Sequence, residues 1–221
     1  MLLYPWCIHC WIPVGFCSLF SKKQGETDMK ILVIHTIYTT RGGEESVVEN
    51  EVEDLKRAGH EVKTLFFSNG GNALVQALKI AALPFNPLSY FQTRRILREF
   101  RPDVVHIHNW NFAASPSVIR AARAEGIAVV LTIHNFRLLC PSATLFHDGN
   151  LFMDSVNGHF PWAAIKKAVY RNSRIITFWL AFSVYVHKKL GTWKGVNKYI
   201  VLNEFTRSLF ARSDLHLGES Q

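Results

Sequence analysis

Histidines and paired glycines stand where the sequence is expected to pass from an apolar strand into a loop. His106 and His108 lie two residues apart near the end of one apolar run, and His134 follows the next such run. Gly42-Gly43 comes after an earlier run, and glycines there let the free N–H groups of a helix N-terminus approach an anion. A plain strand-to-helix turn would use the same two glycines. The pattern indicates a site for a small polar ligand.

The histidines are open to three interpretations. His106 and His108 share one face of their strand, because side chains alternate along it. With His134 they would offer three imidazoles to a metal ion. No Asp or Glu accompanies them at the strand ends, so contact with a sugar or phosphate is favoured and no metal is expected. The third interpretation is hydrogen-bonded core histidines, and His106 fits it best because it lies deepest in the strand.

The elements that must position these residues alternate between strand and helix. Strands are expected near residues 31–34, 61–67, 102–108, 126–133 and 198–202. Helices are expected near residues 44–58, 73–83, 88–100, 116–125, 161–171, 174–190 and 204–212. A tight turn is expected at 147–150, within a long loop from 134 to 158. This alternation predicts right-handed βαβ units, a parallel sheet and an α/β fold, in which ligands gather at the carboxyl ends of the strands.

Several common nucleotide and hydrolase sites are excluded by their missing motifs. The first loop lacks the G-x-G-x-x-G pattern, and the second strand ends without the acidic residue that binds a ribose. No Walker loop and no G-x-S-x-G elbow occurs anywhere in the sequence. We therefore expect no bound dinucleotide and no serine hydrolase site.

The composition is that of a globular protein, with 48% hydrophobic and 19% charged residues. Three of the four cysteines, Cys7, Cys10 and Cys17, lie in the first 17 residues, and Cys140 stands alone. No disulfide framework is indicated, so a reducing compartment is expected. Cys7 and Cys10 have zinc-like spacing but lack a second ligand pair nearby.

The basic excess is concentrated in the last third of the chain. The formal net charge is +8, and residues 160–221 hold 10 Lys+Arg against 3 Asp+Glu. Aromatic residues are interleaved with these cations, and the apolar run 175–186 is too short to span a bilayer. An anionic membrane surface is favoured over a merely solvated face and over nucleic acid. The lysines expected to contact it are Lys166, Lys167, Lys188 and Lys189.

The first 28 residues differ in character from the rest. They are apolar and rich in Trp, Cys and Phe, but lack the positive region and cleavage site of a signal peptide. We interpret residues 1–28 as an extension outside the fold, with a short membrane-contacting anchor as the alternative. Met29 is then the natural start, residues 29–212 form the domain, and 213–221 form a polar tail. Deleting the extension is expected to leave folding unchanged.

A series of short motifs resembles the N-terminal domain of family 4 glycosyltransferases. They occur in order as Met29-Lys-Ile-Leu-Val-Ile, Arg41-Gly-Gly-Glu-Glu45, Gly59-His60-Glu-Val62, Pro102-Asp-Val-Val-His-Ile-His108, Thr132-Ile-His134-Asn135 and Arg137-Leu-Leu-Cys-Pro141. The resemblance covers about residues 29–212. Many members with the last motif carry further cysteines after the following Asp-Gly and in the next helix. Residues 151–155 and 168–170 contain none, which puts a metal or disulfide role for Cys140 in doubt.

The resemblance implies a single Rossmann-like domain, half of a two-domain GT-B enzyme that transfers a sugar with retention and without a metal. His134 would be the catalytic contact to the transferred sugar. Gly42 and Gly43 would approach the donor. The acceptor would be lined by Glu44, His108, Asn109, Asn135 and Arg137.

The resemblance also implies the reaction and its participants. A hexosyl group would pass from a nucleotide-sugar donor to a glycan, lipid-linked or polysaccharide acceptor, with no cofactor. The donor half normally lies in a C-terminal domain, so we expect a truncated or split product that is inactive alone and is completed by a separate C-terminal half. The expected location is cytoplasmic, peripheral on the inner face of the membrane. The alternatives are a non-enzymatic acceptor- or membrane-binding module and, more distantly, a metal-dependent hydrolase.

Overall fold

The computed structural model describes residues 28–38, 42–156, 159–213 and 215. The expected extension therefore lies outside the described residues except for Asp28, and so does most of the expected tail. The zinc hypothesis for Cys7 and Cys10 also lies outside them. Deletion of the extension remains a prediction.

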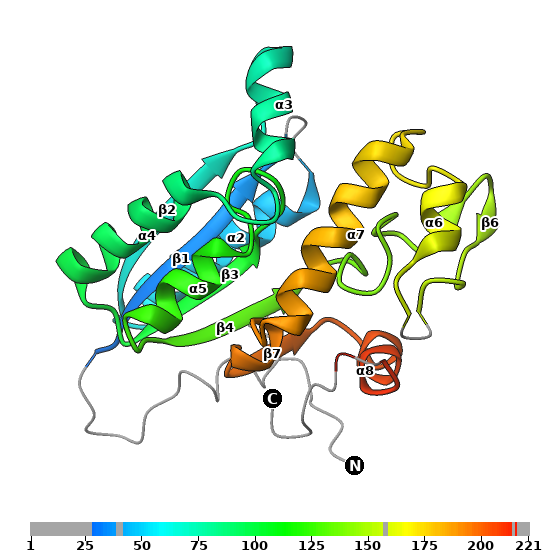
Figure 1. The fold of residues 1–221 in the computed structure, drawn as a ribbon. Coiled ribbons are helices and arrows are strands. Elements are labelled where there is room, and N and C mark those ends of the chain that lie inside the picture. Colours follow the sequence, from blue (N-terminus) through cyan, green and yellow to red (C-terminus); the bar gives the residue numbers. More distant parts are fainter. Residues whose placement is uncertain (1–27, 39–41, 157–158, 214, 216–221) are drawn as a thin grey trace.

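Five parallel strands form the central sheet, in the order β2-β1-β3-β4-β7 (Figure 1). This confirms the predicted α/β fold with a parallel sheet. The strands are β1 (Lys30–Ile37), β2 (Glu61–Ser68), β3 (Val104–Asn109), β4 (Ala128–Ile133) and β7 (Lys198–Val201). Their expected positions agree with these bounds to within a few residues.

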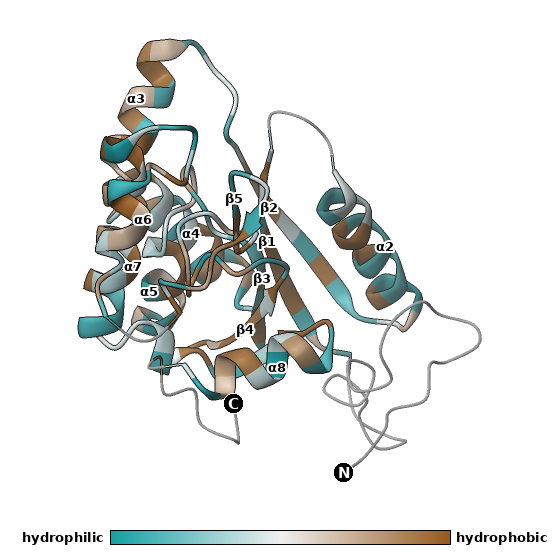
Figure 2. Cartoon of the chain, turned by 90° about the vertical axis from the view of Figure 1, so that its right-hand side faces the viewer, coloured by the Kyte–Doolittle hydropathy of each residue, from teal (hydrophilic) through white to brown (hydrophobic). Residues whose placement is uncertain are grey.

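Helices cover both faces of the sheet unequally. Figure 2 shows α2 (Gly43–Arg57) on one side, with the other large helices on the opposite side. These are α3 (Ala73–Ala81), α4 (Pro87–Phe100), α5 (Ser117–Ala124) and α7 (Arg174–Lys189). The short α6 (Trp162–Lys166), a 3-10 turn at Trp193–Gly195 and α8 (Glu204–Ala211) complete the helices of the described residues.

Alternation along each strand divides the core into two layers. On β1, Ile31 and Val33 pack with the apolar face of α2, whereas Leu32 and Ile34 join the larger cluster under α4 and α5. Val104 of β3 belongs to the α2 layer. The same alternation places His106 and His108 under α2, because they lie two and four residues further along the strand.

The strand order creates a reversal between β1 and β3. The chain leaves β1 through α2 on one face and leaves β3 through α5 on the other, while β1 and β3 are paired neighbours. In open α/β sheets the crevice at the carboxyl ends of such a strand pair is where ligands bind. Gly42-Gly43 and His108 both follow or end these two strands, so the fold places the predicted site at this crevice.

The long loop and the helix after it differ in how well they were predicted. Asp148 and Gly149 have φ of 48° and 76° and form the tight turn between β5 (Phe146–His147) and β6 (Asn150–Leu151), as expected. The helix expected at 161–171 is shorter, because α6 ends at Lys166. Ala168 adopts φ 52°, and Val169 N–H bonds back to the carbonyl of Ala164. A left-handed residue with this backbone bond terminates the helix.

Candidate functional site

Four histidines from three neighbouring strands gather near α2. His35 lies on β1, His106 and His108 lie on β3, and His134 follows β4 directly. The ring centroids of His106 and His108 are 4.2 Å apart, and those of His108 and His134 are 5.3 Å apart. His35 was missed by the sequence analysis. It is buried beside Glu45, with 3.7 Å between His35 Nε2 and Glu45 Oε1, and burial lowers its pKa.

The carboxylate of Glu51 on α2 binds two of these histidines. Its Oε1 lies 2.5 Å from His106 Nδ1 and 3.2 Å from His108 Nε2. Burial opposes ionisation of this carboxyl, but the two adjacent imidazoles lower its pKa to about 2. Sequence analysis missed Glu51 because it considered only strand ends. The available signal was a charged residue in the apolar helix stripe of Val48, Val52 and Leu55.

The hydrogen bonds continue from Glu51 to His134. His108 Nδ1 lies 3.0 Å from His134 Nε2, and His106 Nε2 lies 2.7 Å from Thr132 Oγ1. Burial, reinforced by the neighbouring histidines, lowers the pKa of His108 to about 4 and that of His134 to about 3. Both imidazoles are therefore neutral at pH 7.

The spacing of Glu51, His106 and His108 also bears on the metal interpretation. Their ligand atoms lie within 4.8 Å of one another. A tetrahedral zinc ion with ligands at about 2.0–2.2 Å would hold ligand atoms about 3.3–3.6 Å apart. The 2.5 Å between Glu51 Oε1 and His106 Nδ1 is shorter than the spacing of two ligand atoms on one zinc ion. The observed geometry is thus that of a carboxylate in direct contact with two imidazoles, with its hydrogen bond to His108.

Glu44, Asn135 and Arg137 form the outer edge of the site. Glu44 Oε1 accepts a hydrogen bond of 3.3 Å from Asn135 Nδ2, and Asn135 Oδ1 accepts the N–H of Arg137 at 3.1 Å. Burial raises the pKa of Glu44, and burial together with Glu44 raises the pKa of Tyr38 to about 12. The buried Nη1 of Arg137 has no hydrogen-bond partner within the described residues. This edge therefore offers a carboxyl, an amide and an uncommitted guanidinium nitrogen.

The paired glycines leave open space at the start of α2. A Cβ built on Gly43 would meet nothing within 4 Å, and neither glycine has a positive φ. A side chain at Gly43 would therefore meet no clash within the described residues, and a left-handed backbone conformation is not the reason for glycine at either position. The N–H of Gly42 already donates to Glu45 Oε2 at 2.7 Å, and Tyr38 N–H donates to Glu45 Oε1 at 3.1 Å. A carboxylate thus occupies part of the helix N-terminus.

Two residues predicted to line the acceptor lie behind the open surface. His108 is 4% exposed, and its two ring nitrogens are engaged by Glu51 and His134. Asn109 is 5% exposed; its Nδ2 donates to Thr36 O and its Oδ1 accepts from Asn111 N. Both side chains are committed to the protein, and both also line the small cavity beside His134. Their contact with the acceptor remains a prediction.

A small cavity of about 20 Å³ lies between His134 and Asn111. It is large enough for about one water molecule. Both side-chain polar atoms of Asn111 are buried without a partner in the described residues, and Arg137 also lines the cavity. Asn111 was missed by the sequence analysis, where nothing distinguished it from an ordinary loop asparagine.

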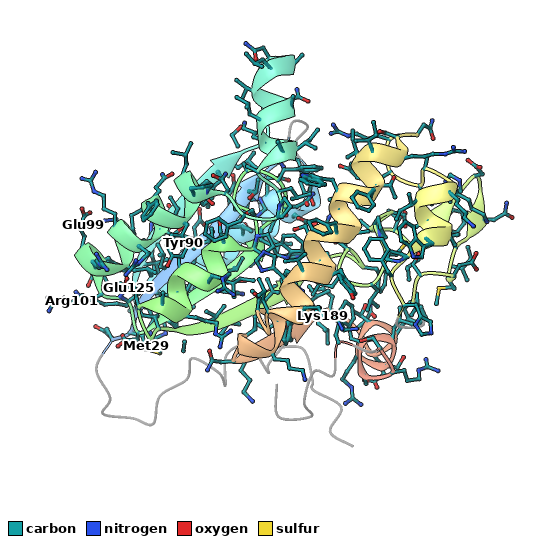
Figure 3. All side chains as sticks on the ribbon, viewed as in Figure 1. Met29, Tyr90, Glu99, Arg101, Glu125 and Lys189 are labelled. Carbon is teal, nitrogen blue, oxygen red and sulfur yellow. The ribbon has the colours of Figure 1, made fainter. Side chains whose placement is uncertain are left out.

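The four predicted membrane lysines lie at helix ends. Lys166 ends α6, and Lys188 and Lys189 lie in the last turn of α7, with Lys189 at the lower end of that helix in Figure 3. Lys167 lies over the ring of Phe152 at 5.0 Å from its centroid. These positions neither require nor exclude a membrane contact.

The arrangement is that of an α/β domain with a cluster of histidines at the carboxyl edge of its parallel sheet. The sequence profile described as Glycosyltransferase Family 4 matches residues 41–202, which is more than half of the chain. The chain therefore belongs to glycosyltransferase family 4, as the motifs predicted. No curated protein and no solved structure matches the chain.

Proposed function

We propose that this domain is the acceptor-side half of a retaining GT-B glycosyltransferase. It would help transfer a hexosyl group from a nucleotide-sugar to a glycan or lipid-linked acceptor, in polysaccharide or glycolipid synthesis. The observation that carries the proposal is the convergence of Gly43, His134 and Asn135 at the crevice between β1, β3 and β4. Open space, a neutral imidazole and an amide are the groups that recognise sugar hydroxyls.

In this proposal His134 contacts the transferred sugar, and Gly42-Gly43 gives the donor room to approach. Glu44, Asn135 and Arg137 line the acceptor. Glu45 caps the backbone beside the paired glycines, which favours a neutral sugar over a diphosphate at this end of α2 because two negative groups would repel.

Cations for the leaving diphosphate would come from a second, nucleotide-binding domain. The described residues form one α/β domain, and the acidic first turn of α2 supplies no such charge. Electrostatic stabilisation of the leaving group is commonly the largest contribution to catalysis in such transfers. We therefore propose that the chain 1–221 turns over its donor only when a nucleotide-binding domain is joined to it or supplied separately.

The test is nucleoside diphosphate release from a panel of UDP- and GDP-hexoses, with and without a nucleotide-binding GT-B domain. Release is expected only in the presence of both partners, and NMR of the product should show a retained anomeric configuration. Release by this chain alone that disappears in His134→Ala would contradict the two-domain proposal. An inverted product would contradict the retaining chemistry.

A peripheral contact with an anionic membrane is a further part of the proposal. None of the described helices is long and apolar enough to cross a bilayer. However, α3 has no buried residue, and it projects from the body of the molecule in Figure 1. Residues 62–98 and 160–203 contain no Asp or Glu. We name as the apolar edge five side chains that are at least 61% exposed: Leu74, Leu78, Leu88, Phe91 and Ile175.

Exposed apolar side chains together with basic residues suit the interfacial layer of an anionic bilayer. The predicted lysines would add electrostatic attraction. A non-enzymatic membrane- or acceptor-binding module would use the same surface, and the nucleotide-release assay separates it from a transferase.

A further inference from the structure

The hydrogen bonds between Glu51 and His134 leave little freedom in where their protons lie. An ionised carboxylate only accepts hydrogen bonds. The nitrogen of His108 that faces Glu51 Oε1 at 3.2 Å, Nε2, must therefore carry a hydrogen. The opposite tautomer would set two lone pairs against each other inside the protein.

The position of the proton on His108 also determines the position of the proton on His134. His108 is neutral, so with Nε2 protonated its Nδ1 is an acceptor. His134 Nε2, which lies 3.0 Å from it, must be the donor. The two ring planes are 25° apart with centroids separated by 5.3 Å. The rings thus meet edge to edge, as an in-plane N–H···N hydrogen bond requires.

One nitrogen remains at the end of the chain. With Nε2 protonated, His134 Nδ1 carries a lone pair, and the hydrogen bond of this ring within the described residues is made by Nε2. The orientation of the His134 ring is set by its hydrogen bond to His108, which in turn contacts Glu51. Both of these residues are buried, with exposed fractions of 4% for His108 and 7% for Glu51. A mobile surface histidine would have no such constraint.

We propose that Glu51 is a positioning residue that, through His108, makes His134 an obligate hydrogen-bond acceptor. The group that faces His134 Nδ1 must then be a donor, such as a sugar hydroxyl, and not a phosphate oxygen. The identity of that group as a sugar hydroxyl rests on the proposed function. The proton arrangement itself does not.

The test uses the full chain labelled with ¹⁵N in histidine and two-bond ¹H–¹⁵N spectra, which show which ring nitrogen is protonated. At pH 7 we expect His108 and His134 both as neutral Nε2–H tautomers. In Glu51→Leu, which removes the acceptor, both should become mixtures of two tautomers. Glu51→Gln keeps an acceptor oxygen and should retain most of the wild-type pattern.

His187 is the internal control for folding. Its Nε2 faces the carbonyl of Pro84 at 2.5 Å and its Nδ1 faces Thr192 Oγ1 at 2.8 Å, so its tautomer is set independently of Glu51. A wild-type spectrum with His134 as Nδ1–H, or as a mixture, would overturn the proposal whether or not any variant folds. So would a Glu51→Leu spectrum unchanged at both histidines while His187 is also unchanged.

Failure of this inference is distinguishable from failure of the proposed function. If the protein shows the expected tautomers but transfers no sugar, the proton arrangement is supported and the proposed function is contradicted. If it is a transferase that needs His134 but His134 has the other tautomer, the proposed function is supported and the role of Glu51 is contradicted.

Discussion

Glu51 places a carboxylate in the apolar face of a helix and directly over two strand histidines. Removing a partner from a buried charge leaves that charge unpaired, which costs several kcal/mol. His108 and the adjoining His134 are in turn neutral, because burial lowers their pKa values. The residues of the site therefore depend on one another for their protonation, and pH is the variable to which they should respond.

We predict that the folded protein loses stability as pH falls from 7 to 5. His108 and His134 have lowered pKa values in the fold, of about 4 and about 3, and the ordinary value of 6.5 when unfolded. Below pH 6.5 the unfolded chain binds more protons, so acid favours unfolding. Glu51, with its pKa lowered to about 2, adds a loss in the same direction below its unfolded value of 4.5.

The two histidines together should lower the free energy of unfolding by about 2–4 kcal/mol between pH 7 and pH 5. Urea denaturation at each pH measures this difference. A His108→Gln, His134→Gln variant should lose most of it. Equal stability of the wild-type protein at the two pH values would show that these histidines are not buried in neutral form.

At the residue scale, sequence reasoning predicted the histidines of the site but not the carboxylate of Glu51 that contacts them. Strand alternation correctly placed His106 and His108 on one face and His106 in the core. Glu51 was not predicted, because its contact with β3 depends on how α2 is rotated over the sheet. Helical periodicity shows which residues share a face of the helix, but not which strand that face covers. The side chain of Asn109 is held by hydrogen bonds to Thr36 and Asn111, and a short sequence motif does not show these contacts.

At the scale of elements, the start of α2 combines an open glycine with a capping carboxylate. Gly43→Ala should stabilise the fold by about 0.4–1 kcal/mol, because Gly43 has helical geometry and its Cβ would meet no atom. If a sugar approaches there, the same change should reduce turnover with the nucleotide-binding domain. Denaturation and nucleotide release measure the two effects. Higher stability with unchanged turnover would contradict the proposal that the sugar approaches this end of α2.

The apolar edge and the basic helix ends make a second prediction at this scale. Co-sedimentation with anionic vesicles should weaken with salt, and should fall at least about 100-fold when Lys166, Lys167, Lys188 and Lys189 become Gln, since each contributes about 1 kcal/mol. Leu78→Gln with Phe91→Gln should also weaken binding.

A double change of Lys56 and Lys63 to Gln serves as the matched control and should have little effect. Equal binding to neutral vesicles would contradict the electrostatic attraction, and absence of binding to anionic ones would remove the membrane contact altogether.

Elements were predicted more reliably than their ends and their exposure. Apolar and β-branched runs marked all five strands of the main sheet, most clearly β1, β3 and β4, which are largely buried. Helix α6 was predicted too long because Ala168 adopts a left-handed conformation that its residue type does not signal. Helix α3 is apolar, yet none of its residues is fully buried, and Ile80 packs against the cluster of Leu83, Phe112 and Leu180.

At the scale of the whole molecule, the strand order joins these parts into one site. Motifs more than 90 residues apart, such as Glu44 and Asn135, meet because β1, β3 and β4 are adjacent in the sheet. The sequence predicted a parallel sheet but not this order, since alternation of strands and helices is compatible with several orders. The order β2-β1-β3-β4-β7, with β1 and β3 as paired neighbours, is the one that the chain adopts.

The most direct test of the account is the steady-state kinetics of His134→Ala in the reaction with the nucleotide-binding domain. If His134 contacts the reacting sugar, kcat should fall by about 100-fold while KM changes little, because the lost interaction belongs to the transition state. His60→Ala is the matched control, since His60 lies at the opposite, amino end of the sheet beside Met29, and it should retain wild-type kcat. An unchanged kcat in His134→Ala, or an equal loss in His60→Ala, would contradict the central claim that this histidine network serves sugar transfer.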